Sequence, residues 1–215
     1  MTPSCFLDPK AVAASRRAEL KNVLTALATG AALLATGLFA WNHYFLGLAL
    51  GLVYSNGFEY VYHRFVLHDR EGRLSNNHQL HHSSFGQADE PRNVTFGGSP
   101  IEVGIVIVLN SVPFALFDWL GAGIGAGVVT GFVVYFTAFE EMHWRMHLGW
   151  LPNRLEWMRL HHFAHHRGEE GRYNVFLPLC DRLFAWTLPR RRAVVIPFST
   201  RQPSAQSSER KDKAA

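Results

Sequence analysis

The chain has 215 residues, of which 48% are hydrophobic and 18% charged, and its formal net charge is +4. This length suits one domain, and two cysteines are too few for a disulfide-stapled secreted protein. An aromatic content of 13% and long apolar runs exclude intrinsic disorder for all but the ends. These runs also argue against a purely soluble protein, because about 20 apolar residues cross the hydrocarbon core of a bilayer as a helix.

Four apolar runs predict an all-α integral membrane protein. The first two spans are expected at 22–41 and 44–62, and the last two at about 100–120 and 122–140. Because the connection within each pair is very short, the four transmembrane helices should form two hairpins. The longer segments outside the spans carry the histidines described below, and we expect them to form a helical, metal-binding cap in the cytosol.

The domain organisation follows from these spans. Residues 1–21 are expected to be a cytosolic N-terminal segment, 22–197 the membrane domain, and 198–215 a basic tail. The tail is rich in Ser, Gln, Lys and Arg, which predicts disorder.

The basic residues indicate the orientation. None of the 21 Lys and Arg residues falls in a predicted span or in a short turn between paired spans. The positive-inside rule therefore places both termini and the middle stretch in the cytoplasm. Because the basic residues flank spans and form no single stripe, a nucleic-acid partner is disfavoured. The small single-module form suits a bacterial inner membrane.

Glycines four residues apart predict close helix packing. The run that opens the fourth span does not match the dinucleotide-binding pattern G-x-G-x-x-G. Small residues at this spacing let membrane helices approach each other closely. Gly127 and Gly131, with Gly47 and Gly51 in the second span, are therefore expected at helix contacts.

Eleven of the twelve histidines fall into four tight clusters, and His43 stands alone. The clusters are His63 with His68, then His78, His81 and His82, then His143 with His147, and lastly His161, His162, His165 and His166. Most of these spacings are i, i+3 or i+4, which put side chains on one face of an α-helix. The first pair is five residues apart, about 140° around an α-helix, which suits a helix end.

Topology allows the four clusters to meet. The second and fourth spans run in the same direction, and a histidine cluster emerges at the cytoplasmic end of each. Neutral imidazole is the commonest protein ligand for transition metals. Eleven ligands are too many for one ion, so the sequence predicts two ions held by all eleven. The ligand set alone leaves the metal open, since zinc binds nitrogen ligands more strongly than iron(II) does.

Two carboxylates are placed to support the ligands. Glu59 precedes His63 by four residues and Glu140 precedes His143 by three, so each shares a helical face with a predicted ligand. A carboxylate that accepts the second N–H of a bound imidazole orients the ring and raises its basicity. We therefore predict this role for both glutamates.

The ordered motifs HRFVLH, HQLHH, HWRMH and HHFAHH resemble those of the fatty acid hydroxylase/sterol desaturase superfamily of membrane oxidases. The segment from Tyr173 to Phe184 is similar to the family's closing segment, with departures at Val175 and Cys180. The resemblance covers roughly residues 40–187. It implies that Asn174 and Asp181 also support the site.

The resemblance further implies a non-haem di-iron centre that uses O₂ to hydroxylate a C–H bond of a lipid or fatty acyl substrate. Zinc could replace iron in isolated protein. The two cysteines cannot supply an iron–sulfur cluster, so the electrons should come from a separate ferredoxin- or cytochrome-type donor with its reductase.

The sequence is compatible with other functions. A carotenoid ring hydroxylase has a similar size and histidine set, and a lipid or sterol desaturase could use the same metal site. A metal-binding membrane protein without catalytic activity is the alternative from another class. Buried, converging histidines beside a lipid-lined cavity would favour an enzyme, whereas exposed and scattered histidines would favour storage.

Overall fold

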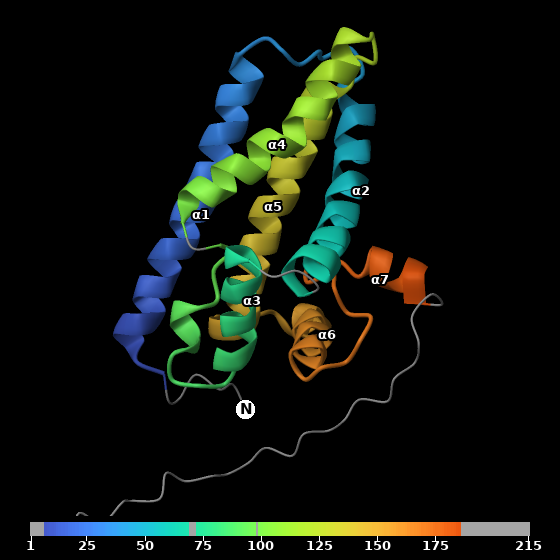
Figure 1. The fold of residues 1–215 in the computed structure, drawn as a ribbon. Coiled ribbons are helices and arrows are strands. Elements are labelled where there is room, and N and C mark those ends of the chain that lie inside the picture. Colours follow the sequence, from blue (N-terminus) through green and yellow to red (C-terminus); the bar gives the residue numbers. More distant parts are fainter. Residues whose placement is uncertain (1–6, 69–71, 98, 186–215) are drawn as a thin grey trace, which may run out of the picture.

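The computed structural model describes residues 7–68, 72–97 and 99–185, in which all regular secondary structure is helical. Four long helices form a bundle (Figure 1), and they are α1 (Pro9–Ala35), α2 (Tyr44–Tyr62), α4 (Pro100–Trp119) and α5 (Gly125–Leu148). Three shorter helices lie at the lower end of this bundle, and they are α3 (Arg73–Ser84), α6 (Glu156–His166) and α7 (Leu179–Phe184). The predicted all-α class is confirmed.

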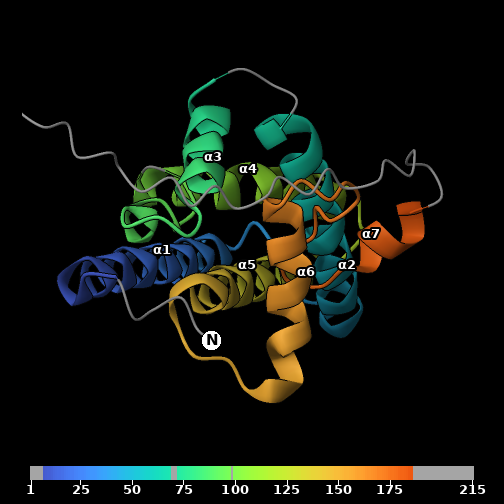
Figure 2. The ribbon, with the colours of Figure 1, turned by 90° about the horizontal axis from the view of Figure 1, so that it is seen from below.

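The short helices form a cap across one end of the bundle. Figure 2 looks onto this end and shows α6 crossing beneath α2 and α5, with α3 beside it. Three single turns complete the described helices, namely a π-helix at His63–His68 and 3₁₀ turns at Glu90–Arg92 and Asn153–Leu155. Within the described residues, α4 is the one helix both long and apolar enough to cross a membrane by length and composition.

The first helix differs from its predicted span at both ends. It begins at Pro9, because Pro9 suits a first helical position and the Asp8 side chain accepts a hydrogen bond from the backbone N–H of Lys10 at 3.0 Å. It ends at Ala35, two residues before Gly37 takes a left-handed backbone with φ of +74°. The segment expected to precede the span therefore forms the first turns of α1.

The fourth helix is also displaced from its prediction. It begins at Gly125, after Gly121 and Gly123 adopt positive φ angles in the connection from α4. It continues to Leu148, beyond the predicted end at 140, and so carries the third histidine pair. The predicted tail, 198–215, and the domain boundary at 197 lie outside the described residues.

Helices α2 and α5 pack backbone against backbone. A Cβ atom added at Gly51 would lie 2.6 Å from the carbonyl oxygen of Val128, and one at Gly131 would lie 2.8 Å from that of Leu48. Gly47 and Gly127 leave still less space. The predicted role of the four glycines is confirmed, and their contact fixes the register of the two helices that lead into the site.

The buried core lies along α5. Ala26 of α1, Ile107 of α4 and Phe132 of α5 belong to one apolar cluster inside the bundle. A second cluster, which includes Met146, Met158 and Val175, joins the lower end of α5 to α6 and to the segment that follows it. These clusters hold the cap against the end of the bundle.

Candidate metal centre

Ten histidines gather into two groups of five where the cap meets the bundle. We call them the outer and inner clusters. The outer cluster consists of His63, His68, His78, His82 and His165, and the inner cluster of His81, His143, His147, His162 and His166. In each group, one ring nitrogen per residue lies within 4.8 Å of the others. His68 is exposed, whereas four inner-cluster residues are buried.

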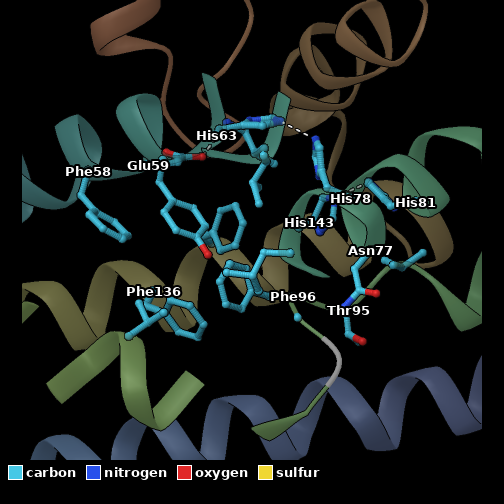
Figure 3. Close-up of a pocket in the computed structure, with 18 of the residues that line it drawn as sticks. Phe58, Glu59, His63, Asn77, His78, His81, Thr95, Phe96, Phe136 and His143 are labelled. Atoms are coloured by element: carbon cyan, nitrogen blue, oxygen red, sulfur yellow. Dashed lines mark hydrogen bonds between the residues drawn. The ribbon is translucent and has the colours of Figure 1, made fainter. Parts of the chain in front are cut away.

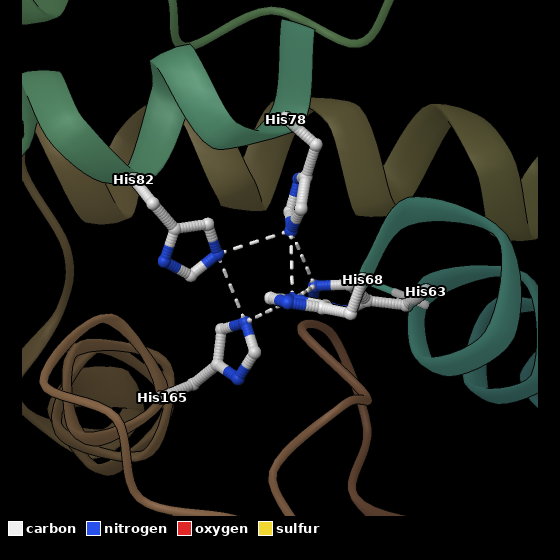
Figure 4. A group of neighbouring side chains, drawn as sticks. All are labelled: His63, His68, His78, His82 and His165. Carbon is white, nitrogen blue, oxygen red and sulfur yellow. Dashed lines mark hydrogen bonds between the residues drawn. The ribbon is translucent and has the colours of Figure 1, made fainter. Parts of the chain in front are cut away.

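The Nε2 atoms of the outer cluster form a closed ring (Figure 4). Successive Nε2–Nε2 distances around the ring are 3.0, 3.0, 3.1, 3.2 and 3.3 Å, in the order His63, His78, His82, His165, His68 and back to His63. A further contact of 3.0 Å joins His68 to His78. Two nitrogens bound at right angles to one ion, each at about 2.1 Å, would lie about 3.0 Å apart. These spacings therefore suit ligands of a single ion.

Hydrogen bonds alone cannot explain this ring. A neutral imidazole carries one N–H, and a protonated ring nitrogen has no lone pair with which to accept. Around three mutually touching nitrogens, such as those of His63, His68 and His78, donors and acceptors cannot alternate. In addition, Nδ1 of His63 lies 2.5 Å from the carbonyl oxygen of Tyr173, so its proton is at Nδ1 and its Nε2 lone pair faces the ring. A bound cation would resolve this arrangement, because each Nε2 lone pair could then face the ion.

The inner cluster has the same character. Nε2 of His147 lies 2.8 Å from Nε2 of His162, which lies 3.0 Å from Nε2 of His166. Nε2 of His143 lies 3.2 Å from that of His81. The ring of His143 also donates to the backbone carbonyl of Val94. Its remaining lone pair therefore points into the cluster, as the ligand form requires.

Burial keeps the histidines neutral. Desolvation, together with the neighbouring imidazoles of His68 and His143, lowers the pKa of His82 to about 3. The same two causes hold the pKa values of His81, His162 and His165 well below 6.5. Since only the neutral imidazole offers a lone pair to a metal, these buried histidines are in their ligand form at neutral pH.

Helices α3 and α6 each contribute to both clusters. On α3, His78 and His82 face the outer cluster while His81 faces the inner one. On α6, His162 and His166 face the inner cluster while His165 faces the outer one. Residues i and i+4 are about 40° apart around an α-helix, so they face the same cluster. Residue i+3 lies about 60° from residue i in the opposite direction, so it faces the other cluster. The prediction that all three histidines of each helix share one face therefore holds only for the i, i+4 pair of each helix.

The first histidine pair is brought together by the π-helix at His63–His68. In this conformation residue i hydrogen-bonds residue i+5, so residues five apart lie above one another. The Nε2 atoms of His63 and His68 are consequently 3.3 Å apart, although an α-helix would separate the rings by about 140°.

His161 is not brought into either cluster. Its Nε2 lies 3.1 Å from a carboxylate oxygen of Asp181, and its Nδ1 lies 3.0 Å from Nη1 of Arg172. Arginine only donates, so His161 accepts at Nδ1 and donates at Nε2 to Asp181. Both ring nitrogens are thus engaged away from the clusters, because His161 lies about 100° around α6 from His162.

The four predicted supporting residues are buried near the site, but none directly contacts a cluster imidazole in the hydrogen bonds described. Glu59 accepts from the backbone N–H of Val175, and Glu140 from that of Phe96. Asp181 accepts from the backbone N–H groups of Tyr173 and Asn174. The side chain of Asn174 donates to Glu59 at 3.1 Å. These residues organise the loops behind the histidines.

The carboxylate that does contact a cluster imidazole is Glu90, which the sequence interpretation missed. Its Oε1 lies 2.7 Å from Nδ1 of His147, and both groups are buried. Its Oε2 accepts from the backbone N–H of Gly86 at 2.9 Å. Glu90 follows α3 in a short loop and shows no periodicity with any histidine, so no sequence signal marked it.

A cavity of about 100 Å³ adjoins both clusters. Figure 3 shows His63, His78, His81 and His143 around one end, and Phe58 and Phe136 farther along its wall. The remaining lining is largely aromatic or aliphatic, and includes Phe96, Phe132 and Phe139. An apolar molecule in this cavity would lie directly against histidines of both clusters.

Comparisons with known proteins agree with this geometry. Neither curated proteins nor solved structures yielded a match. The family model for fatty acid hydroxylases matches residues 48–185, which include all ten clustered histidines and the loops that hold them. The chain therefore belongs to the fatty acid hydroxylase family.

Proposed function

We propose that the protein is a membrane-embedded oxygenase that hydroxylates a C–H bond of a lipid or fatty acyl chain. The observation that carries the proposal is the apolar cavity whose one end is lined by histidines of both clusters. Its aromatic walls suit a hydrocarbon chain and offer few partners to a polar substrate. Solvent-exposed, scattered histidines would instead suit metal storage.

Two iron ions, when bound, would supply the reduction of O₂. The balanced reaction converts R–H, O₂, two electrons and two protons into R–OH and water. The residues of this chain contribute the remaining functions. The clustered histidines hold the ions, Phe58 and Phe136 position the hydrocarbon, and the buried walls around His143 limit water at the reacting carbon.

The surface of the bundle supports four membrane spans. Large apolar side chains point outward from every long helix, for example Leu24 of α1, Phe45 of α2, Leu109 of α4 and Val134 of α5. Large apolar side chains exposed in this way are unfavourable in water and suit lipid. Such a setting would let a lipid substrate reach the cavity from within the bilayer.

The distribution of charge supports a cytoplasmic metal centre. The connections at the upper end of the bundle in Figure 1, residues 36–43 and 120–124, contain no Lys or Arg. Basic residues flank the opposite end, with Arg16 on α1, Arg73 on α3 and Arg159 on α6. By the positive-inside rule, the cap and both termini would face the cytoplasm, in a bacterium at the inner membrane.

The electrons would come from a separate protein. The chain has only two cysteines, which cannot hold an iron–sulfur cluster. A ferredoxin- or cytochrome-type donor with its reductase would dock at the cytoplasmic cap. The outer cluster is the nearer one to solvent, because His68 is exposed.

Lipid mass spectrometry tests the proposal. Cells that express the chain should contain a lipid species that has gained one oxygen, and cells that express His162→Ala should lack it. Purified wild-type protein should hold about two iron ions by elemental analysis. A product that has lost two hydrogens would indicate a desaturase, and two bound ions with unchanged lipids would indicate a metal-binding protein without this activity.

A further inference from the structure

Two buried glutamates occupy equivalent positions relative to the two clusters. Glu59 lies one helical turn before His63 on α2, and Glu140 lies one turn before His143 on α5. Both side chains are buried, and both accept hydrogen bonds from the backbone of a loop that passes behind the histidine. His63 belongs to the outer cluster and His143 to the inner one.

Glu59 accepts four hydrogen bonds. Its Oε1 accepts from the backbone N–H groups of Val175 at 2.6 Å and Phe176 at 3.2 Å. Its Oε2 accepts from the hydroxyl of Tyr135 at 2.5 Å and the amide of Asn174 at 3.1 Å. The loop held in this way presents the carbonyl of Tyr173 to Nδ1 of His63.

Glu140 makes corresponding contacts beside the inner cluster. It accepts from the backbone N–H of Phe96 at 3.1 Å and from the side-chain amide of Asn22 at 2.7 Å. The same amide of Asn22 donates to the carbonyl of Phe96 at 3.0 Å, which fixes this residue further. Two residues earlier, the carbonyl of Val94 accepts a hydrogen bond from His143.

The two arrangements share one geometry. In each, the glutamate carboxylate accepts a hydrogen bond from the backbone N–H of a loop residue. The backbone carbonyl two residues before that loop residue accepts a hydrogen bond from the imidazole of the histidine one turn after the glutamate. That hydrogen bond fixes the imidazole tautomer and leaves the Nε2 lone pair facing the cluster. If the loop moved, the ring could rotate or change tautomer, and the lone pair would be lost to the metal.

We propose that Glu59 and Glu140 are positioning residues, each of which sets one ligand of one metal ion through a backbone carbonyl. Glu59 serves the outer cluster and Glu140 the inner cluster. The inference rests on the proposed function in one respect, namely that both clusters bind metal. Neither glutamate is a ligand, since their carboxylates are occupied by loop and side-chain donors.

Cobalt(II) binding to purified protein in detergent tests this proposal without turnover. Wild-type protein should bind two equivalents, measured by competition with a chromophoric chelator and by the visible cobalt spectrum. Glu59→Gln turns one oxygen that accepts two hydrogen bonds into a donor, and should weaken one equivalent by roughly 10–100-fold. Glu140→Ala should weaken the other equivalent by a similar factor, and the double variant should weaken both.

The chain offers matched controls. Glu141 is adjacent to Glu140, but its carboxylate pairs with Arg16 and Arg145 and holds no loop, so Glu141→Ala should bind both equivalents like wild type. Glu140→Gln keeps an oxygen for Phe96 and Asn22 and should restore most of the affinity lost in Glu140→Ala. Far-UV circular dichroism checks the fold of each variant.

Milder variants keep the test decisive if a substitution prevents folding. Tyr135→Phe and Asn22→Ala each remove one hydrogen bond to a carboxylate and should weaken one equivalent several-fold. Folded variants that bind both equivalents as wild type does would overturn the proposal, as would equal weakening in Glu141→Ala. Wild-type protein that binds two equivalents but leaves lipids unchanged would refute the oxygenase function alone.

Discussion

Oε1 of Glu90 lies 2.7 Å from Nδ1 of His147, and the two residues are 57 positions apart in the chain. This contact joins the loop after α3 to the last turn of α5 and holds the inner-cluster imidazole in the tautomer whose Nε2 faces His162. It is the one side-chain carboxylate found on a cluster histidine among the described hydrogen bonds. The loop is therefore part of the candidate metal centre.

Glu90→Ala should reduce the amount of metal that the protein binds. Without the carboxylate, Nδ1 of His147 loses its buried acceptor, and such changes typically cost roughly 10–100-fold in metal affinity or activity. Metal content by elemental analysis and chelator competition measures the effect. Asp89→Asn is the matched control, because Asp89 is adjacent and exposed, and it should keep both ions. An unchanged affinity in Glu90→Ala would remove Glu90 from the site.

His161 and His162 are neighbours on α6 with different expected roles. His162→Ala removes an inner-cluster nitrogen and should lower the metal content below two ions per chain and abolish product formation. His161→Ala removes only the contacts with Asp181 and Arg172, and should keep about two ions. Elemental analysis of both purified variants makes the comparison. Equal loss of metal in the two would restore His161 to the ligand set.

Much of the site follows from helical periodicity. The i, i+4 pairs on α3, α5 and α6 share faces because 3.6 residues make one turn, and this local rule holds in the fold. Which cluster each pair joins depends on how α3 and α6 lie against α5. That arrangement is tertiary, so the sequence could not show that His81 joins one cluster while His78 and His82 join the other.

Other features were not predicted from the sequence, each for a physical reason. The approach of His63 to His68 depends on a π-helix, whose hydrogen bonding departs from the α-helical period used for prediction. The contact of Glu90 with His147 joins the 3₁₀ turn after α3 to α5, which lie far apart in the sequence. The start of α1 was missed because charged residues ended the apolar run, although Arg, Lys and Glu are good helix formers.

The close contact between α2 and α5 predicts that alanine substitutions at two glycines of α2 will affect stability differently. Gly51→Ala would place its Cβ 2.6 Å from the carbonyl oxygen of Val128, and should destabilise the protein by about 1–3 kcal/mol. Gly57→Ala has open space and should be neutral or slightly stabilising, because alanine is the better helix former. Thermal unfolding in detergent compares them. Equal midpoints would show that the helices are not packed through Gly51.

The neutral histidines predict how the metal-free protein responds to acid. Their pKa values are lowered in the fold, to about 3 for His82, whereas exposed histidine in the unfolded chain titrates near 6.5. Below pH 6.5 the unfolded state therefore binds more protons than the folded state, so the free energy of unfolding falls as the pH falls. Above pH 6.5 histidine contributes no such slope.

Chelator-treated protein should accordingly unfold at progressively lower denaturant concentrations between pH 6.5 and pH 5. The variant His82→Gln, which lacks one of these buried imidazoles, should show a shallower dependence than wild type over the same interval. Circular dichroism at a series of pH values measures both curves. A wild-type stability that stays constant or rises on acidification would contradict a cluster of buried, neutral imidazoles.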